Sequence, residues 1–198
     1  MRVLLSRLVF GWHYRLTTIG VEQVPKSGPV LLLGNHISWI DFIFLQWALR
    51  RTICFVMHEE YYDWPVLRSI LKALNVISIK PVNSRGVLKN IITALENNKA
   101  VCLFPEGGIS TDGEFAPLMR GFEKVLAKTD VDVTVVPFAI NNMWGDILSL
   151  ASREVRKQQK LSFRRCVNLS FGLRLGLNAT RVEVERSISQ ILSQSNLS

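Results

Sequence analysis

The sequence predicts an α/β domain with a mostly parallel central sheet flanked by helices. Short apolar runs of strand length alternate along the chain with longer segments whose apolar residues recur at helical spacing. Neither an internal repeat nor a low-complexity linker interrupts this alternation, so residues 1–198 are predicted to form one domain. The composition is 48% apolar and 20% charged, which is typical of a globular chain rather than a disordered one.

The predicted strands and helices follow each other in an order typical of parallel sheets. The strands are expected at residues 30–35, 53–57, 76–79, 100–104, 133–140 and 166–172. The helices are expected at residues 41–49, 65–74, 86–97, 121–128 and 180–194. Pro65 falls in the first turn of the second helix, where a proline is tolerated.

Residues 1–15 are predicted to form a helix at a membrane interface. Val3, Leu4, Leu8 and Trp12 would lie on one side of that helix, flanked by arginines. A helix that packs on the domain itself is the alternative. No run of about 20 apolar residues could span a bilayer, and the N-terminus lacks the features of a secretory signal. We therefore expect a peripheral membrane protein.

The chain is basic, with 24 Lys and Arg against 16 Asp and Glu and a net charge of +8. This charge favours anionic partners such as acidic lipid headgroups or an acidic carrier protein. The densest basic stretch is residues 153–165, "REVRKQQKLSFRR", for which a solvated loop is the alternative. Phe163 is its only aromatic residue and no RNA-binding signature accompanies it, so nucleic acid is not expected as a partner.

The three cysteines, Cys54, Cys102 and Cys166, predict neither a disulfide framework nor a zinc site. Their number is odd and no Cys-x-x-Cys pair occurs. Cys54 and Cys102 lie in apolar strand-like runs, which indicates buried thiols in a reducing compartment.

Two predicted strands end on residues that can do chemistry, and ligands of parallel sheets bind at such ends. The strand "VLLLGN" is followed by His36, and Asp41 lies five residues further along. A regular helix would place these two side chains about 140° apart. If Ser38 were the N-cap, His36 would lie outside the helix and could fold back onto Asp41. The imidazole Nε2 would then be a base for an alcohol, while two unrelated polar residues are the alternative.

The strand "AVCLF" is followed by "PEGG", residues 105–108. Glu106 could bind a hydroxyl or a cation, and the glycines allow a ligand to approach the backbone closely. Free N–H groups at this point could receive an anion. An ordinary glycine turn between strand and loop is the alternative.

Together these stretches resemble the conserved blocks of the glycerolipid acyltransferases, the family of lysophosphatidate and lysophospholipid acyltransferases. "NHISWID" is similar to the family's Asn-His-x4-Asp block, and "FPEGGIS" to its Phe-Pro-Glu-Gly block. "ISIKPVNSRG" falls where the family has its second block, and "VVPFAI" resembles a late block centred on a proline. The resemblance runs from about Leu16 to Gly172.

The resemblance implies that an acyl group passes from acyl-ACP or acyl-CoA to the free hydroxyl of a lysophospholipid. His36 would be the general base and Asp41 would orient and stabilise its imidazolium, with no covalent acyl-enzyme, metal or cofactor. The enzyme would work on the cytoplasmic face of the membrane. The residues expected to bind substrate are Glu106, Gly107, Gly108, Ser110, Lys80, Arg85 and Arg120.

The chain departs from the commonest form of the family at two blocks. Gly108 and Ile109 stand where Thr and Arg are usual, which removes a natural bidentate partner for a phosphate monoester. Lys80 and Arg85 surround Pro81 in place of the usual Ile-Asp-Arg run. "PEGGISTDGEF" is more similar to the acyltransferase domain of bacterial 2-acylglycerophosphoethanolamine acyltransferases, which favours an acceptor that carries a headgroup. Lysophosphatidate is the alternative acceptor, and an acyl-thioester hydrolase or a non-catalytic lipid-binding module are alternative functions.

Overall fold

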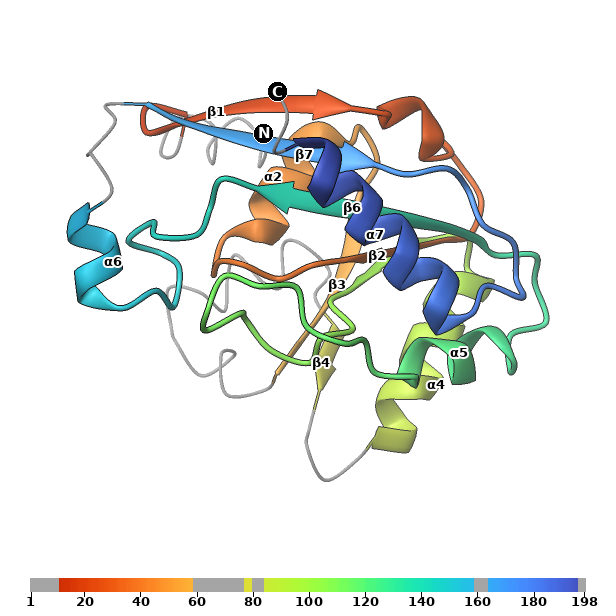
Figure 1. The fold of residues 1–198 in the computed structure, drawn as a ribbon. Helices are drawn as coiled ribbons and strands as arrows, with labels where there is room; N and C mark the ends of the chain where they lie inside the picture. Colours follow the sequence, from red (N-terminus) through yellow and green to blue (C-terminus); the bar gives the residue numbers. More distant parts are fainter. Residues whose placement is uncertain (1–10, 59–76, 80–83, 159–163, 196–198) are drawn as a thin grey trace.

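In the computed structural model, described for residues 11–58, 77–79, 84–158 and 164–195, helices cover both faces of one seven-stranded sheet (Figure 1). The strands are β1 (Tyr14–Ile19), β2 (Val30–Gly34), β3 (Ile53–His58), β4 (Ile77–Ile79), β5 (Ala100–Leu103), β6 (Thr134–Asn141) and β7 (Arg165–Phe171). The helices are η1 (Val21–Gln23), α2 (Asp41–Ala48), α4 (Ser84–Glu96), α5 (Gly121–Leu126), α6 (Arg153–Gln158) and α7 (Arg181–Ser195).

The strand order is β1-β7-β6-β2-β5-β3-β4, and five neighbouring strands from β6 to β4 run parallel. β7 is antiparallel to β6, and β1 is parallel to β7. The carboxyl ends of β2, β5 and β6 therefore lie at one edge of the sheet, together with the first residues of β1 and β7. We call this edge the carboxyl edge. The predicted mostly parallel α/β sheet is confirmed.

The central strand β2 is buried on both faces, because helices lie on each side of the sheet. Val30 and Leu32 face the cluster that includes α2, while Leu31 and Leu33 face the cluster that includes α4, α5 and α7. All four side chains are fully buried. Such a strand reads as a continuous apolar run rather than as an alternating one.

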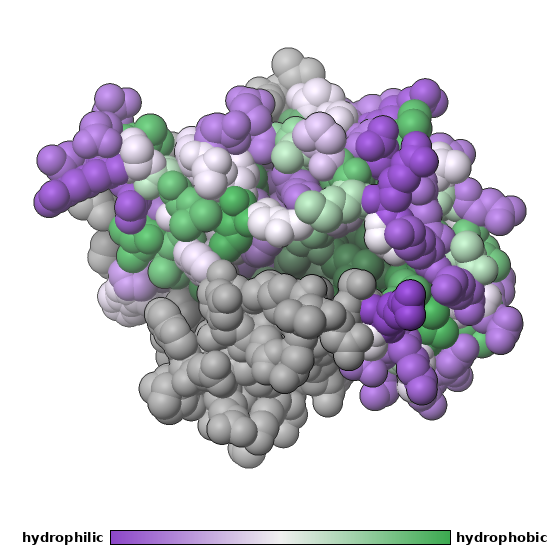
Figure 2. All heavy atoms as spheres, turned by 90° about the horizontal axis from the view of Figure 1, so that it is seen from below, coloured by the Kyte–Doolittle hydropathy of each residue, from purple (hydrophilic) through white to green (hydrophobic). Residues whose placement is uncertain are grey.

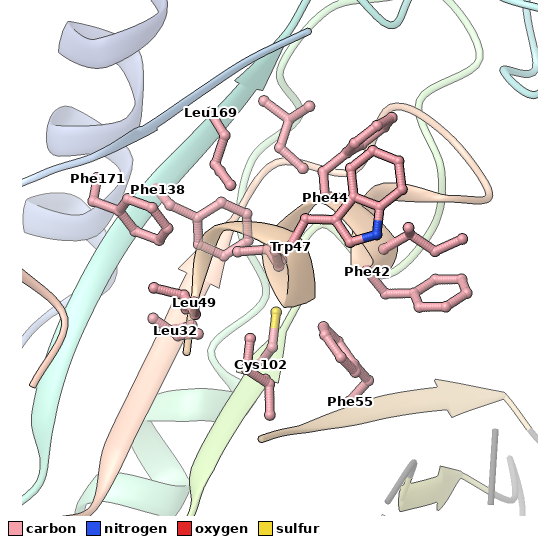
Figure 3. Close-up of a cluster of buried hydrophobic side chains, with 14 of the residues drawn as sticks. Leu32, Phe42, Phe44, Trp47, Leu49, Phe55, Cys102, Phe138, Leu169 and Phe171 are labelled. Carbon is pink, nitrogen blue, oxygen red and sulfur yellow. The ribbon is translucent and has the colours of Figure 1, made fainter. Parts of the chain in front are cut away.

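Aromatic side chains of α2 fill the space between that helix and the sheet (Figure 3). Phe42 meets Phe55 of β3 edge to face, with ring centroids 5.8 Å apart. Phe44 packs in the same way against Trp47 on its own helix and Tyr14 of β1. This packing fixes α2, and with it Asp41 at the first helical position, against the sheet.

The N-terminal prediction is wrong at its end, because Tyr14 and Arg15 begin a strand rather than finish a helix. β1 pairs along its whole length with β7, and the buried Tyr14 packs into the core. These tertiary contacts override a weak helical pattern. Residues 1–10 of the predicted helix lie outside the described residues, as do the predicted helix 65–74 with Pro65 and Lys80 of the second block.

The basic stretch divides into parts with different environments. Arg153–Gln158 forms the short helix α6, which has no buried residue and projects at one side of the molecule (Figure 1). Arg165, by contrast, lies in β7 with its side chain only 21% exposed and close to Asp146. The alternative of a solvated loop is therefore wrong for Arg165.

The remaining sequence predictions concern cysteines and membrane spans. Cys54 and Cys102 are buried as predicted, and burial raises the pKa of both thiols, while Cys166 is exposed. Within the described parts of the chain, no helix is both long and apolar enough to cross a bilayer.

Candidate active site

His36 and Asp41 form a hydrogen-bonded pair at the carboxyl edge, just beyond the end of β2. The imidazole Nδ1 lies 2.9 Å from Asp41 Oδ2. The side chain of His36 is 21% exposed, whereas that of Asp41 is fully buried. Because an ionised carboxylate can only accept, the ring nitrogen facing it carries the proton, and Nε2 has the free lone pair.

The buried Asp41 carboxylate is satisfied by the turn that precedes its own helix. Oδ2 accepts the backbone N–H groups of Ile37 at 2.7 Å and Ser38 at 2.9 Å, and Oδ1 accepts the Ser38 hydroxyl at 2.7 Å. These bonds wrap residues 36–41 around the carboxylate. The turn thereby brings His36 back to Asp41, which a regular helix over the same residues would not do.

The predicted N-cap role of Ser38 is wrong. α2 begins at Asp41, Ile40 occupies the N-cap position, and no side chain caps the helix. The Ser38 hydroxyl donates to Asp41 and lies 3.3 Å from the backbone N–H of Ile40. The Ser38 hydroxyl lies inside the turn, where it donates to the carboxylate of Asp41, and hydrogen bonds to an ionised acceptor are stronger than neutral ones.

Glu106 joins the second motif to the first. Its Oε1 accepts the backbone N–H of His36 at 2.7 Å, and its Oε2 accepts the N–H of Ala116 at 2.8 Å. Burial raises the pKa of Glu106, against the lowering effect of these two bonds. The carboxylate therefore ties the loop after β5 to the turn after β2, with one backbone N–H on each of its oxygens.

Gly107 and Gly108 differ in what their backbone requires. Gly107 has φ +84°, and a Cβ there would lie 2.5 Å from Met119 Cε. Gly108 is exposed, and a Cβ at that position would meet no atom within 4 Å. Gly107 is thus required by the fold of the loop, whereas Gly108 leaves the backbone open to a ligand.

Ser110 holds the end of the same loop. Its N–H donates to the carbonyl of His36 at 2.8 Å, and its hydroxyl accepts the N–H of Gly113 at 2.9 Å. The hydroxyl also lies 3.0 Å from Asp112 Oδ1. Both backbone polar groups of His36 are therefore hydrogen-bonded, its N–H to Glu106 and its carbonyl to Ser110.

A protein-family model described as Acyltransferase matches residues 15–141. The chain belongs to the acyltransferase family. The match covers β1 to β6, and therefore includes the His36–Asp41 pair and the Glu106 loop. The predicted family resemblance is confirmed.

Two known acyltransferases have sequences that align with about two thirds of this chain. The 1-acyl-sn-glycerol-3-phosphate acyltransferase of Helicobacter pylori is 26% identical over 134 residues, which is 65% of this chain and 56% of that protein. The lyso-ornithine lipid O-acyltransferase of Pseudomonas aeruginosa is 26% identical over 145 residues, 70% of this chain and 55% of that protein. The chain spans about half the length of these relatives.

A solved structure has the same fold. The crystal structure of the 1-acyl-sn-glycerophosphate acyltransferase of Thermotoga maritima superposes with a TM-score of 0.77 at 21% identity. The superposition covers 98% of this chain and 78% of that one. At this identity the likeness concerns the fold.

The basic residues predicted to bind substrate are not part of the hydrogen-bonded network of this acyltransferase-family site. Arg120 follows Met119, whose N–H donates to Pro105, so it lies next to the Glu106 loop. Its side chain is 72% exposed, and its Nε is 3.9 Å from Glu123. Arg85 is exposed in the first turn of α4. Among the described residues, neither guanidinium hydrogen-bonds to the His36–Asp41 pair, here called the dyad, or to Glu106.

Sequence reasoning missed two residues that shape the acyltransferase-family site. Phe104 stacks on the His36 ring, with centroids 4.1 Å apart and planes inclined by 14°. Asn35 exchanges two hydrogen bonds with the backbone of Ile140 in β6, at 2.9 and 2.8 Å. The position of Asn35 directly before His36 was the available signal, since a buried amide there can prolong strand pairing.

Within the described residues, no group of three or more His, Cys, Asp and Glu side chains is placed to hold a metal ion.

Proposed function

We propose that this chain transfers a fatty acyl group from an acyl thioester to the free hydroxyl of a lysolipid, with His36 as general base. The His36–Asp41 pair carries this proposal, because its geometry leaves Nε2 as an acceptor at a partly exposed position. Membership of the acyltransferase family supports the reaction class. The stacked Phe104 ring restricts rotation of the imidazole, which favours one direction for its free nitrogen.

The reaction follows from this arrangement. His36 Nε2 takes the proton of the lysolipid hydroxyl while the hydroxyl oxygen attacks the thioester carbonyl carbon. The resulting oxyanion collapses and the carbon–sulfur bond breaks. The sulfur takes the proton back from His36 and leaves as a thiol. Asp41 stabilises the imidazolium that exists between the two proton transfers.

The loop after Glu106 supplies candidates for binding the oxyanion. Among the described residues, none accepts a hydrogen bond from the backbone N–H of Gly108 or Ile109. Both ends of this short loop are tied to His36 through Glu106 and Ser110. Fixed N–H donors close to the base are suited to a charge that develops in the transition state.

Two acceptors fit this site for different reasons. Four of the known relatives are named for acyl transfer to 1-acyl-sn-glycerol-3-phosphate and two for acyl transfer to lyso-ornithine lipid. The names of the first group support lysophosphatidate. Gly108 and Ile109, in place of a threonine and an arginine, favour an acceptor with a headgroup such as lysophosphatidylethanolamine. Either acyl-ACP or acyl-CoA is the donor.

The substrates reach the site from a membrane surface, at the apolar rim formed by Trp39, Ile147 and Leu150. These side chains are 40%, 72% and 41% exposed. They are neighbours, because the Trp39 N–H donates to Leu148 at 3.0 Å. Figure 2 shows hydrophobic surface beside the hydrophilic projection at the left, where Figure 1 places α6.

The charge next to the apolar rim fits an anionic bilayer. Arg153, Arg156 and Lys157 are exposed on α6, which begins three residues after Leu150. Apolar side chains at the surface with adjacent cations are the usual composition of an interfacial segment. The cytoplasmic face carries the anionic lipids that this arrangement would meet, so we place the chain there.

A matrix of acceptors and donors tests the proposed function. Lysophosphatidate and lysophosphatidylethanolamine are each incubated with labelled acyl-ACP and labelled acyl-CoA, and the products are separated from free fatty acid. Labelled diacyl lipid that depends on the lysolipid supports the proposal. Free fatty acid released at the same rate with or without lysolipid indicates a hydrolase instead. Vesicle binding with no turnover of any donor indicates a lipid-binding module.

A further inference from the structure

Asp146 is a buried carboxylate outside the region that the family model matches. It lies in the segment 142–150, which follows β6 at the carboxyl edge, whereas the matched residues end at 141. Its residue exposure is 9%. A buried carboxylate costs free energy unless its oxygens are hydrogen-bonded or paired, so its partners indicate what it holds.

The partners of Asp146 come from the first residues of two strands. The Tyr14 hydroxyl of β1 donates to Oδ1 at 2.9 Å, and Arg165 Nη1 of β7 lies 3.7 Å from Oδ2. The Arg165 guanidinium also donates to the carbonyls of Asn142 and Trp144 in the same segment. Burial and the neighbouring Asp146 raise the pKa of Tyr14, which keeps its hydroxyl protonated as a donor.

Asp146 also fixes the backbone two and three residues further along. Its Oδ1 accepts the N–H of Leu148 at 2.9 Å. Its carbonyl accepts the N–H of Ser149 at 3.1 Å and the Ser149 hydroxyl at 2.7 Å. The backbone of Leu148 and Ser149 is thus held by one residue, which is itself anchored to β1 and β7.

Leu148 and Ser149 contact the turn of residues 36–41, which we call the dyad turn. The carbonyl of Leu148 accepts the N–H of Trp39 at 3.0 Å, and Ser149 forms an isolated β-bridge with Ser38. The hydroxyl of Ser38 in turn donates to Asp41 Oδ1. Consecutive contacts therefore lead from Asp146 through residues 148–149 and 38–39 to the carboxylate that orients His36.

We infer that Asp146 is a positioning residue, which holds the Asp41 turn at Ser38 and Trp39, whereas Glu106 holds it at His36. Glu106 and Ser110 hold the chain at His36, while the Asp146 segment holds it at Ser38 and Trp39. The dyad turn lies between these two supports. A displacement of this turn by a fraction of an ångström would move Nε2 relative to the hydroxyl that it must deprotonate. This inference rests on the proposed function for its kinetic part only.

The test compares Asp146→Ala and Asp146→Asn with Arg51→Met in the full chain. Arg51 is the matched control, because its guanidinium also joins separate loops through backbone carbonyls, at 3.0 Å from Pro25, 2.7 Å from Gly28 and 3.0 Å from Asn98. Gly28 and Asn98 precede β2 and β5, so this anchor lies at the sheet edge opposite the dyad. Each variant is measured for kcat and KM well below its Tm, and for the amide NMR resonances of Ile37, Ser38 and Trp39.

The expected pattern separates positioning from general stability. Asp146→Ala should lower kcat by about tenfold or more, with little change in KM, and shift the three amide resonances. Asp146→Asn, which keeps an acceptor for Tyr14 and Leu148, should recover part of the loss. Arg51→Met should lower Tm while leaving kcat within about twofold and the amides in place.

Wild-type kcat in Asp146→Ala, unmoved amide resonances in it, or an equal loss of kcat in Arg51→Met would each overturn the inference. If the wild-type chain transfers no acyl group, the proposed function fails, and the amide resonances alone still decide whether Asp146 positions the turn.

Discussion

The carboxylate of Glu106 accepts the backbone N–H of His36 at 2.7 Å, although 70 positions separate the two residues in the chain. β2 and β5 are hydrogen-bonded neighbours, so the loops that follow them meet at the carboxyl edge. The segments around His36 and Glu106 are thus physically joined, and the glutamate of the second segment supports the histidine of the first. This relationship supports a role for Glu106 in the architecture of the site, while its contact with a substrate stays a prediction.

Replacing Glu106 by alanine should damage both stability and activity. The substitution leaves the N–H groups of His36 and Ala116 without their acceptor, at a cost of about 1–3 kcal/mol for each that stays buried. Because His36 loses one of its two backbone anchors, kcat should fall more than the loss of folded protein explains. Thermal unfolding and kcat measured on the same preparation separate the two effects.

Glu114→Ala is the control for that substitution, since Glu114 is an exposed residue of the same loop. It should leave Tm and kcat close to the wild-type values. If Glu106→Ala behaves like Glu114→Ala, the proposed architectural role of Glu106 is wrong.

The stability of the protein should carry a pH dependence that comes from Glu106. Burial raises its pKa in the folded state above the ordinary value of 4.5. Between these two values the folded chain keeps a proton that the unfolded chain has released, so this group's contribution to the free energy of unfolding falls as pH rises. The difference in free energy of unfolding between wild type and Glu106→Gln should therefore decrease from about pH 4.5 towards neutrality. Denaturant titrations at several pH values measure this difference, and an increase with pH would show the opposite sign.

Gly107→Ala and Gly108→Ala should differ sharply despite being neighbours. An alanine at Gly107 would adopt φ +84° and bring its Cβ to 2.5 Å from Met119 Cε, so it should cost about 1–3 kcal/mol. An alanine at Gly108 meets no atom within 4 Å, so stability should hardly change. The same variant probes the proposed oxyanion site, because a new methyl group stands beside the free N–H of Gly108, and kcat should fall. Equal stability of the two variants would contradict the positive φ of Gly107 and the open space at Gly108.

Charge placed on the apolar rim should weaken membrane binding. The double substitution of Ile147 and Leu150 by aspartate should reduce sedimentation with vesicles that contain anionic lipid, because both side chains are exposed next to α6. Leu173→Asp is the matched control: its side chain is 74% exposed, but it follows the end of β7 at the opposite edge. Equal loss of binding in the control would show that the rim is not the docking surface.

The central strands of the sheet can be predicted from the sequence, whereas the strand at its edge cannot. The run at Val30–Gly34 is apolar at successive positions because helices cover both faces of β2, so its burial could be predicted. β1 could not, because its sequence "YRLTTI" is mostly exposed and depends on pairing with β7 for its conformation. Local signals at the N-terminus favoured a helix instead.

The same contrast holds for the site. The His-x4-Asp spacing suggested a dyad, but the turn that makes it possible depends on where the Asp41 oxygens point. The residue type and position of Ser38 predict a helix cap, whereas its hydroxyl donates to the carboxylate of Asp41 inside the turn. Asp146 carried no sequence signal at all, since its partners Tyr14 and Arg165 are distant in the chain and belong to two different strands.

Single-turnover acyl transfer by His36→Ala tests whether His36 is the base of the reaction. The variant is mixed in excess with labelled acyl thioester and lysolipid, after its Tm has been shown to match that of the wild type. We expect a rate lower by about a thousandfold or more, since the hydroxyl proton would have no positioned acceptor. A folded His36→Ala variant that keeps more than about a tenth of the wild-type rate would contradict the account.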